Sequence, residues 1–141
     1  MDQFISFVIN HWVLWLALVF ILALLLLQEF QDKLRGVSAV MASQLTLLMN
    51  HEEAVAVDIR DSHHFNTSHI LGAINIPVAE LSEKVSQLTG KKKAIILIDA
   101  SGQQAANAAV LLRKHGINDV RILKGGMTSW QNDRLPLVKS K

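Results

Sequence analysis

The chain divides into a long apolar stretch near its start and a second part in which short apolar runs alternate with polar segments. From Phe4 to Leu27 the only polar side chains are Ser6, Asn10 and His11. This is about the length that a helix needs to cross the hydrocarbon core of a bilayer. The pattern predicts a transmembrane anchor over residues 4–27, followed by a polar juxtamembrane continuation and linker over residues 28–36.

A cleaved signal peptide is the alternative to a retained anchor. It would carry a basic start and a small-residue cleavage site, whereas Asp2 is the only charge upstream and Gln28-Glu29-Phe30 follows. Every Lys and Arg lies after the span, beginning with Lys33. The positive-inside rule therefore predicts a single-pass protein of the cell inner membrane, with its N-terminus outside and its C-terminal domain in the cytoplasm. The expected membrane contact is the lipid bilayer around residues 4–27.

In residues 37–141, apolar runs of strand length alternate with segments of helical period, which predicts an α/β domain with a mainly parallel sheet flanked by helices. Strands are expected over 37–41, 53–59, 74–76, 95–98 and 120–123. Helices are expected over 43–50, 78–88 and 104–115, with a short helical turn around Trp130. Ser43 is expected to cap the first helix, and residues 62–68 form a polar segment without an assigned element.

The central strand, Ile95–Ile98, runs directly into Asp99, a small-residue turn and an alanine-rich helix. Such a strand–loop–helix directs backbone N–H groups and the positive end of the helix dipole at one point. In α/β sheets, ligands bind at the carboxyl ends of strands. One hypothesis is that the Asp99 carboxylate accepts hydrogen bonds from the N–H groups of residues 100–105. The alternative is a solvated carboxylate at a strand end.

Composition removes several classes of function. The chain has 141 residues, a formal net charge of +2 and no Cys, so it has no disulfide, thiolate metal site or thiol nucleophile. The positive charge is too small and scattered to predict a nucleic-acid partner. His63, His64 and His69 are interpreted as structural or surface imidazoles, so no metal or cofactor is expected.

Three separated motifs carry a resemblance to a known family. These are Asp58-Ile59-Arg60 followed by Phe65, the stretch His69–Pro77, and Leu123-Lys124-Gly125-Gly126 with Trp130. Over about residues 37–138 the chain resembles the rhodanese-like family, and in particular bacterial single-domain members that one N-terminal helix tethers to the membrane. The resemblance implies the rhodanese-like fold for residues 37–141.

The departures from the family pattern bear on activity. At the position of Asp99 the family has the cysteine that carries the persulfide, in a loop resembling C-R-x-G-x-R, and here Ala100 and Gln104 replace both arginines. Sulfur transfer needs a thiolate that attacks a sulfane sulfur and then leaves. A carboxylate oxygen forms no persulfide, so we expect a pseudoenzyme with no catalytic residue and a degenerate site at Asp99.

Other residues of these motifs are interpreted as structural. Asp58 and Arg60 are expected to form a pair that ties the strand end to the following loop, and Trp130 to anchor the core. Lys91 to Lys93 form a charged turn, for which solvation is the first interpretation and attraction to anionic lipid the second.

The sequence therefore predicts a membrane-tethered, catalytically inactive binding or scaffolding module with an unidentified protein partner at the inner membrane. The candidate binding surface is the rim of one loop with Arg60 and the Gly125-Gly126 turn nearby; its loop residues are Asp99, Ala100, Ser101, Gly102, Gln103 and Gln104. Two alternatives stay open at this loop: residual hydrolysis of a small ester or anhydride by Asp99, and a small-anion sensor.

Overall fold

The computed structural model describes residues 1, 3, 6–7, 10–34 and 36–140, with the backbone alone for residues 30–34. The chain separates into two compact units, Met1–Gly36 and Val37–Lys141. The first unit contains helix α2 (Trp12–Leu34), whose stretch Trp12–Glu29 is long and apolar enough to cross a membrane. Residues 4–5 and 8–9 of the predicted anchor lie outside the described residues. The helix continues through most of the segment that we expected as juxtamembrane continuation and linker.

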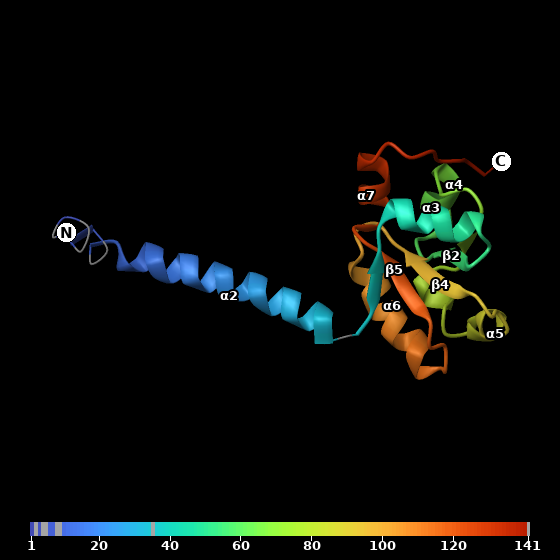
Figure 1. Cartoon of the computed structure of the whole chain (residues 1–141), viewed down its shortest axis with the longest axis horizontal. Helices are drawn as coiled ribbons and strands as arrows, with labels where there is room; N and C mark the ends of the chain where they lie inside the picture. The colour runs from blue at the N-terminus through green and yellow to red at the C-terminus, as the bar shows by residue number, and fades with distance from the viewer. Residues whose placement is uncertain (2, 4–5, 8–9, 35, 141) are drawn as a thin grey trace. The chain divides into compact units, whose positions relative to one another are not determined.

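The second unit is built on one parallel sheet of five strands in the order β1-β5-β4-β2-β3 (Figure 1). The strands are β1 (Ser38–Val40), β2 (Ala54–Asp58), β3 (Ile74–Asn75), β4 (Ala94–Ile98) and β5 (Val120–Leu123). All five residues of β4, the middle strand, are buried, as its unbroken apolar run predicts. The expected α/β fold with a parallel sheet is confirmed. Because the strands are parallel, we call the side where they end the carboxyl edge and the opposite side the amino edge.

Helices cover both faces of this sheet. They are α3 (Ala42–Asn50), α4 (Ser62–Thr67), the 3₁₀ helix η1 (Val78–Glu80), α5 (Val85–Thr89), α6 (Gln103–Lys114) and α7 (Gly126–Asn132). Alternate residues of β4 point to opposite faces. Ile95 and Leu97 belong to the core under α5 and α6. Ile96 and Ile98 belong to the core under α3 and α7, where Trp130 is 3% exposed and anchors the packing. Figure 1 shows α3 and α7 on one side of the strands and α6 on the other.

The single amphipathic helix expected over residues 78–88 is wrong, because the structure divides this segment into η1 and α5. Leu81, Val85 and Leu88 are buried as the pattern requires, but Val78 is 42% exposed. Apolar spacings of three and four residues also suit a 3₁₀ turn followed by a short α-helix. The pattern therefore identified three of its four positions as buried without locating the break between the two helices.

Two helix starts also differ from the expectation. Met41, not Ser43, is the N-cap of α3, and the Gln44 side chain accepts the Met41 backbone N–H at 2.9 Å. The polar segment after β2 forms α4, whose N-cap Asp61 accepts the backbone N–H of His64 at 2.9 Å. A short polar helix lacks the apolar stripe by which longer helices are detected, and only its cap residue marks it.

Candidate functional site

Asp99 follows β4 at the carboxyl edge and is held by the loop that comes after it. One carboxylate oxygen accepts the backbone N–H of Gly102 at 2.5 Å, and the other accepts those of Gln104 at 2.9 Å and Ala105 at 3.2 Å. The residue is 1% exposed. The hypothesis that the carboxylate fills the N–H cradle of its own loop is confirmed, and the solvated alternative is wrong. These hydrogen bonds satisfy both oxygens of a side chain that is buried away from water.

The beginning of α7 donates hydrogen bonds to the same loop. The backbone N–H of Met127 donates to the Asp99 carbonyl at 2.8 Å, and the N–H and hydroxyl of Thr128 donate to the Ala100 carbonyl at 3.1 and 3.0 Å. Gly126 has a φ of +58°, and a Cβ there would lie 2.5 Å from the Asp99 carbonyl oxygen. Only glycine permits this approach, so the Gly125-Gly126 turn lies against the loop, as the resemblance implied.

Asp58 and Arg60 form the structural pair predicted from the sequence. Asp58 is fully buried, and the Arg60 guanidinium donates to its carboxylate at distances from 2.7 to 3.1 Å. The same guanidinium donates to the carbonyl of Ser68 at 2.7 Å. The Arg60 side chain is only 12% exposed. Its guanidinium is engaged by the Asp58 carboxylate at the end of β2 and by the Ser68 carbonyl after α4.

A cleft of about 500 Å³ opens at the carboxyl edge beside the Asp99 loop. Its lining comes from the end of β2, from α4, η1, the loop and α7: Ile59, Arg60, Asp61, His64, Pro77, Val78, Ala79, Ala100, Gln104, Met127, Thr128 and Gln131. Of the predicted binding residues, Arg60, Ala100 and Gln104 line this cleft. Asp99 lies outside the lining, as do Ser101, Gly102 and Gln103.

Sequence reasoning missed the η1 and α7 sides of the cleft. The motif ending at Pro77 and the Gly125-Gly126 turn were recognised, but the residues immediately after each of them were assigned only to the core or a helix. Those residues, Val78 and Thr128 among them, face the loop from segments far away in sequence. The signal that would have found them is their position directly after a motif at the carboxyl edge.

One end of the cleft carries negative charge. Asp61 accepts from the backbone and, at 2.6 Å, contacts the imidazole Nδ1 of His64. The backbone N–H of His64, followed by its ring, holds the pKa of the Asp61 carboxyl below its ordinary value. The rest of the lining offers amides from Gln104 and Gln131 and the exposed apolar surface of Val78. Carboxylate, amide and apolar groups in one cleft suit contact with a peptide or protein surface.

The histidines take structural or surface positions. The rings of His63 and His64 are 5.8 Å apart at 78°, and His69 stacks on Phe65 with ring centroids 3.9 Å apart. The Nδ1 of His69 lies 2.8 Å from the Phe65 carbonyl oxygen, and its backbone pairs with Val138. Within the described ranges, no three His, Asp or Glu side chains gather as metal ligands would.

A five-stranded parallel sheet whose middle strand opens into a loop and helix that form an N–H cradle is an α/β architecture with its site at the carboxyl edge. The family model described as the rhodanese-like domain matches residues 41–133. The chain belongs to the rhodanese-like family.

The chain is similar along its whole length to the uncharacterized protein YibN of Escherichia coli (strain K12), with 34% identity over 143 residues that cover 100% of both chains. Among solved structures, the Alr3790 protein from Anabaena sp. is 28% identical with a TM-score of 0.65, covering 72% of this chain and 80% of that one. A thiosulfate sulfurtransferase from Pseudomonas aeruginosa is 26% identical with a TM-score of 0.70, covering 78% of this chain and 22% of that one.

Proposed function

We propose that this protein is a membrane-tethered, catalytically inactive rhodanese-like domain that docks another protein at the cytoplasmic face of the inner membrane. The docking surface is the cleft at the carboxyl edge. The observation that carries the proposal is the Asp99 carboxylate, which stands at the family's nucleophile position and accepts three N–H groups of its own loop. The loop thus has an internal carboxyl group at the position where the family has a reacting sulfur.

Residual hydrolysis by Asp99 receives less support from the geometry. A nucleophilic carboxylate must reach the substrate, but Asp99 is 1% exposed and lies outside the residues that line the cleft. Both of its oxygens accept backbone N–H groups. The Thr128 hydroxyl in the lining donates to the Ala100 carbonyl. The cleft can therefore contact a partner, while its carboxylate at the nucleophile position is withdrawn from it.

A small-anion sensor also receives less support than protein docking. The backbone N–H groups that would bind an anion are occupied by Asp99, and Arg60 is engaged with Asp58 and Ser68. Asp61 adds a negative charge to the same cleft, and its lowered pKa keeps it ionised at neutral pH. These charges oppose an anionic ligand.

Site-specific photo-crosslinking in native membranes tests the docking surface. Photoreactive residues at Gln104 and Gln131 sample two sides of the cleft, and Gln87 on α5 is an exposed control outside it. We expect the same discrete protein adduct from Gln104 and Gln131, and its absence from Gln87. Equal labelling at all three positions, or no adduct at the cleft, would contradict docking there.

The tether is supported by the apolar helix Trp12–Glu29, and its orientation by the Lys and Arg residues that follow. Because the chain has no cysteine, single substitutions to Cys report on topology without background. In intact spheroplasts we expect an impermeant maleimide to label Gln3→Cys but to reach Ser140→Cys only after lysis. The reverse pattern would place the domain outside, and release of the chain by alkaline carbonate would exclude a span.

A further inference from the structure

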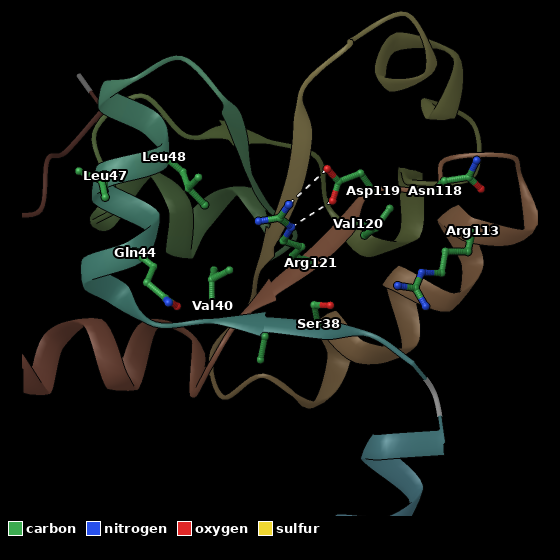
Figure 2. A pocket seen from close by; sticks show the side chains of 11 residues that line it. Ser38, Val40, Gln44, Leu47, Leu48, Arg113, Asn118, Asp119, Val120 and Arg121 are labelled. Carbon is green, nitrogen blue, oxygen red and sulfur yellow. Dashed lines mark hydrogen bonds and ion pairs between the residues drawn. The ribbon is translucent and has the colours of Figure 1, made fainter.

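Two cavities at the amino edge of the sheet share residues and form one continuous surface. The first, of about 720 Å³, runs along β1 and is lined at one end by Ser38, Arg113, Asn118, Asp119 and Arg121. Figure 2 shows Arg113 and Asn118 toward the same end of this groove as Ser38. The second, of about 240 Å³, is lined by Lys91, Lys92, Lys93, Asn118 and Asp119 among others. Asn118 and Asp119 join the two, and we call the whole the amino-edge surface.

The topology of the sheet brings these segments together. Ser38 begins β1, Lys93 directly precedes β4, and Asp119 directly precedes β5. In a parallel sheet the beginnings of the strands lie on one edge. Helix α6 starts at the carboxyl edge and runs back, so that its last residue, Lys114, comes to the amino edge. The amino-edge surface is thus opposite to the edge that carries the Asp99 cleft.

Cations dominate this surface. The linings of the two cavities contain one carboxylate, Asp119, and the cations Lys91, Lys92, Lys93, Arg113 and Arg121. Lys114, Glu52 and Glu53 lie on the same edge outside the linings. Asp119 pairs with Arg121 at 3.0 Å, and the 86% exposed Glu52 lies 3.9 Å from Lys93. In the part of the chain that the structure describes, no carboxylate lies within ion-pair distance of Lys91 or Lys92, and both side chains are exposed.

We propose that the amino-edge surface binds the headgroups of anionic phospholipids. This inference rests on the membrane tether proposed above. The domain begins at this surface, at Ser38, and residues 30–36 connect it to the candidate span. Such a connection reaches at most about 25 Å even when fully extended. A basic surface kept near a bilayer is attracted to anionic headgroups within about a Debye length, ~8 to 10 Å. Binding there leaves the cleft at the carboxyl edge open to a protein partner.

The test uses the full chain in nanodiscs, in which both leaflets are accessible to solutes. A fluorophore on Asn118→Cys reports on the amino-edge surface and one on Gln103→Cys on the opposite edge. Acrylamide serves as the quencher because it is neutral and is not itself repelled by lipid charge. On replacing phosphatidylcholine with a mixture of phosphatidylcholine and phosphatidylglycerol, we expect quenching at Asn118 to fall about threefold and quenching at Gln103 to stay constant.

Charge variants separate lipid binding from mere proximity. The triple variant Lys91→Gln/Lys92→Gln/Lys93→Gln should return quenching at Asn118 to its value in phosphatidylcholine, as should salt at about 0.5 M. The control variant Lys84→Gln/Lys124→Gln/Lys139→Gln removes the same formal charge outside the amino-edge surface and should leave the protection intact.

A third label, at Leu22→Cys, tests membrane insertion of the helix separately from lipid binding at the amino-edge surface. Quenching of Leu22 by spin-labelled lipid reports insertion. If Leu22 is inserted but Asn118 is equally quenched on both bilayers, the lipid assignment is overturned while the tether stands. Protection of Asn118 that persists in the lysine variant would also overturn it. If Leu22 does not enter the bilayer, the tether and this inference fail together.

Discussion

The backbone N–H of Gln104 donates to the carboxylate of Asp99 at 2.9 Å, and this bond joins the end of the central strand to the first turn of α6. A buried backbone N–H needs an acceptor. Here the chain satisfies it with its own side chain. The consequence is that the loop depends for its shape on one buried carboxylate.

Replacing this carboxylate should destabilise the domain. We expect Asp99→Ala to lower the free energy of unfolding by about 3 kcal/mol, since three buried N–H groups lose their acceptor. Asp99→Asn keeps one acceptor oxygen and should lose less. Urea unfolding of the purified chain in detergent measures the change. The exposed Asp133→Ala serves as control, and equal midpoints for Asp99→Ala and the control would contradict a structural cradle.

Gly126 should be intolerant of any side chain. A Cβ there would lie 2.5 Å from the Asp99 carbonyl oxygen and 2.7 Å from the Ser101 nitrogen. We expect Gly126→Ala to reduce stability by about 3 kcal/mol or more, because strain in a left-handed backbone adds to overpacking.

The matched control for Gly126 is Gly116→Ala. Gly116 has a φ of +89° and nothing within 4 Å of the added Cβ. It should cost only the ~1–2 kcal/mol of the left-handed conformation. A Gly126→Ala variant as stable as Gly116→Ala would refute the proposed close packing of α7 against the loop.

The domain contains two Asp-x-Arg pairs that differ in burial. Asp58 is fully buried with Arg60, whereas in the pair of Asp119 with Arg121 the side chains are 57% and 34% exposed. Arg60→Ala should destabilise the fold by about 3 to 5 kcal/mol, because it leaves a buried charge without its partner. Arg121→Ala should cost less than about 1 kcal/mol. Chemical unfolding measures the stability of both variants. Similar losses of stability would mean that burial does not determine how much the Asp58–Arg60 pair contributes.

Sulfur transfer should be absent from the natural sequence. With thiosulfate and cyanide we expect no thiocyanate above buffer, because no thiolate is present to carry the sulfane sulfur. Asp99→Cys alone should give little, since Ala100 and Gln104 replace the family's two arginines. Adding Ala100→Arg and Gln104→Arg to Asp99→Cys should raise the rate further. Turnover by the unmodified chain would overturn the reading of Asp99 as an inert substitute.

The middle of the domain was the easiest part to predict from sequence. The run Ile95–Ile98 predicted a buried strand, and the strand–loop–helix order suggested the Asp99 cradle as one of two alternatives. The Asp58–Arg60 pair could be predicted because its members are near neighbours at a strand end. By contrast, Leu81, Val85 and Leu88 are buried as expected although the single helix over residues 78–88 is not formed, since burial constrains side chains more strongly than it constrains the backbone path.

The far side of the cleft could not be predicted for a different reason. Val78 and Gln131 reach it from η1 and α7, and no periodic pattern records which distant segments face each other. The helix α4 was missed although Asp61 stood in the sequence as a cap residue. Because α4 has only six residues and no apolar stripe, no second signal supported the cap residue.

The internal carboxylate at the end of β4 has a consequence for when the protein can work. A cysteine at that place would change its charge, size and hydrogen bonding each time it was loaded with sulfur or oxidised. Asp99 undergoes neither change, and the chain has no other thiol. Thiol redox chemistry is therefore absent from this loop. A partner docked beside the loop, as proposed, would not meet a surface altered by thiol chemistry at this position.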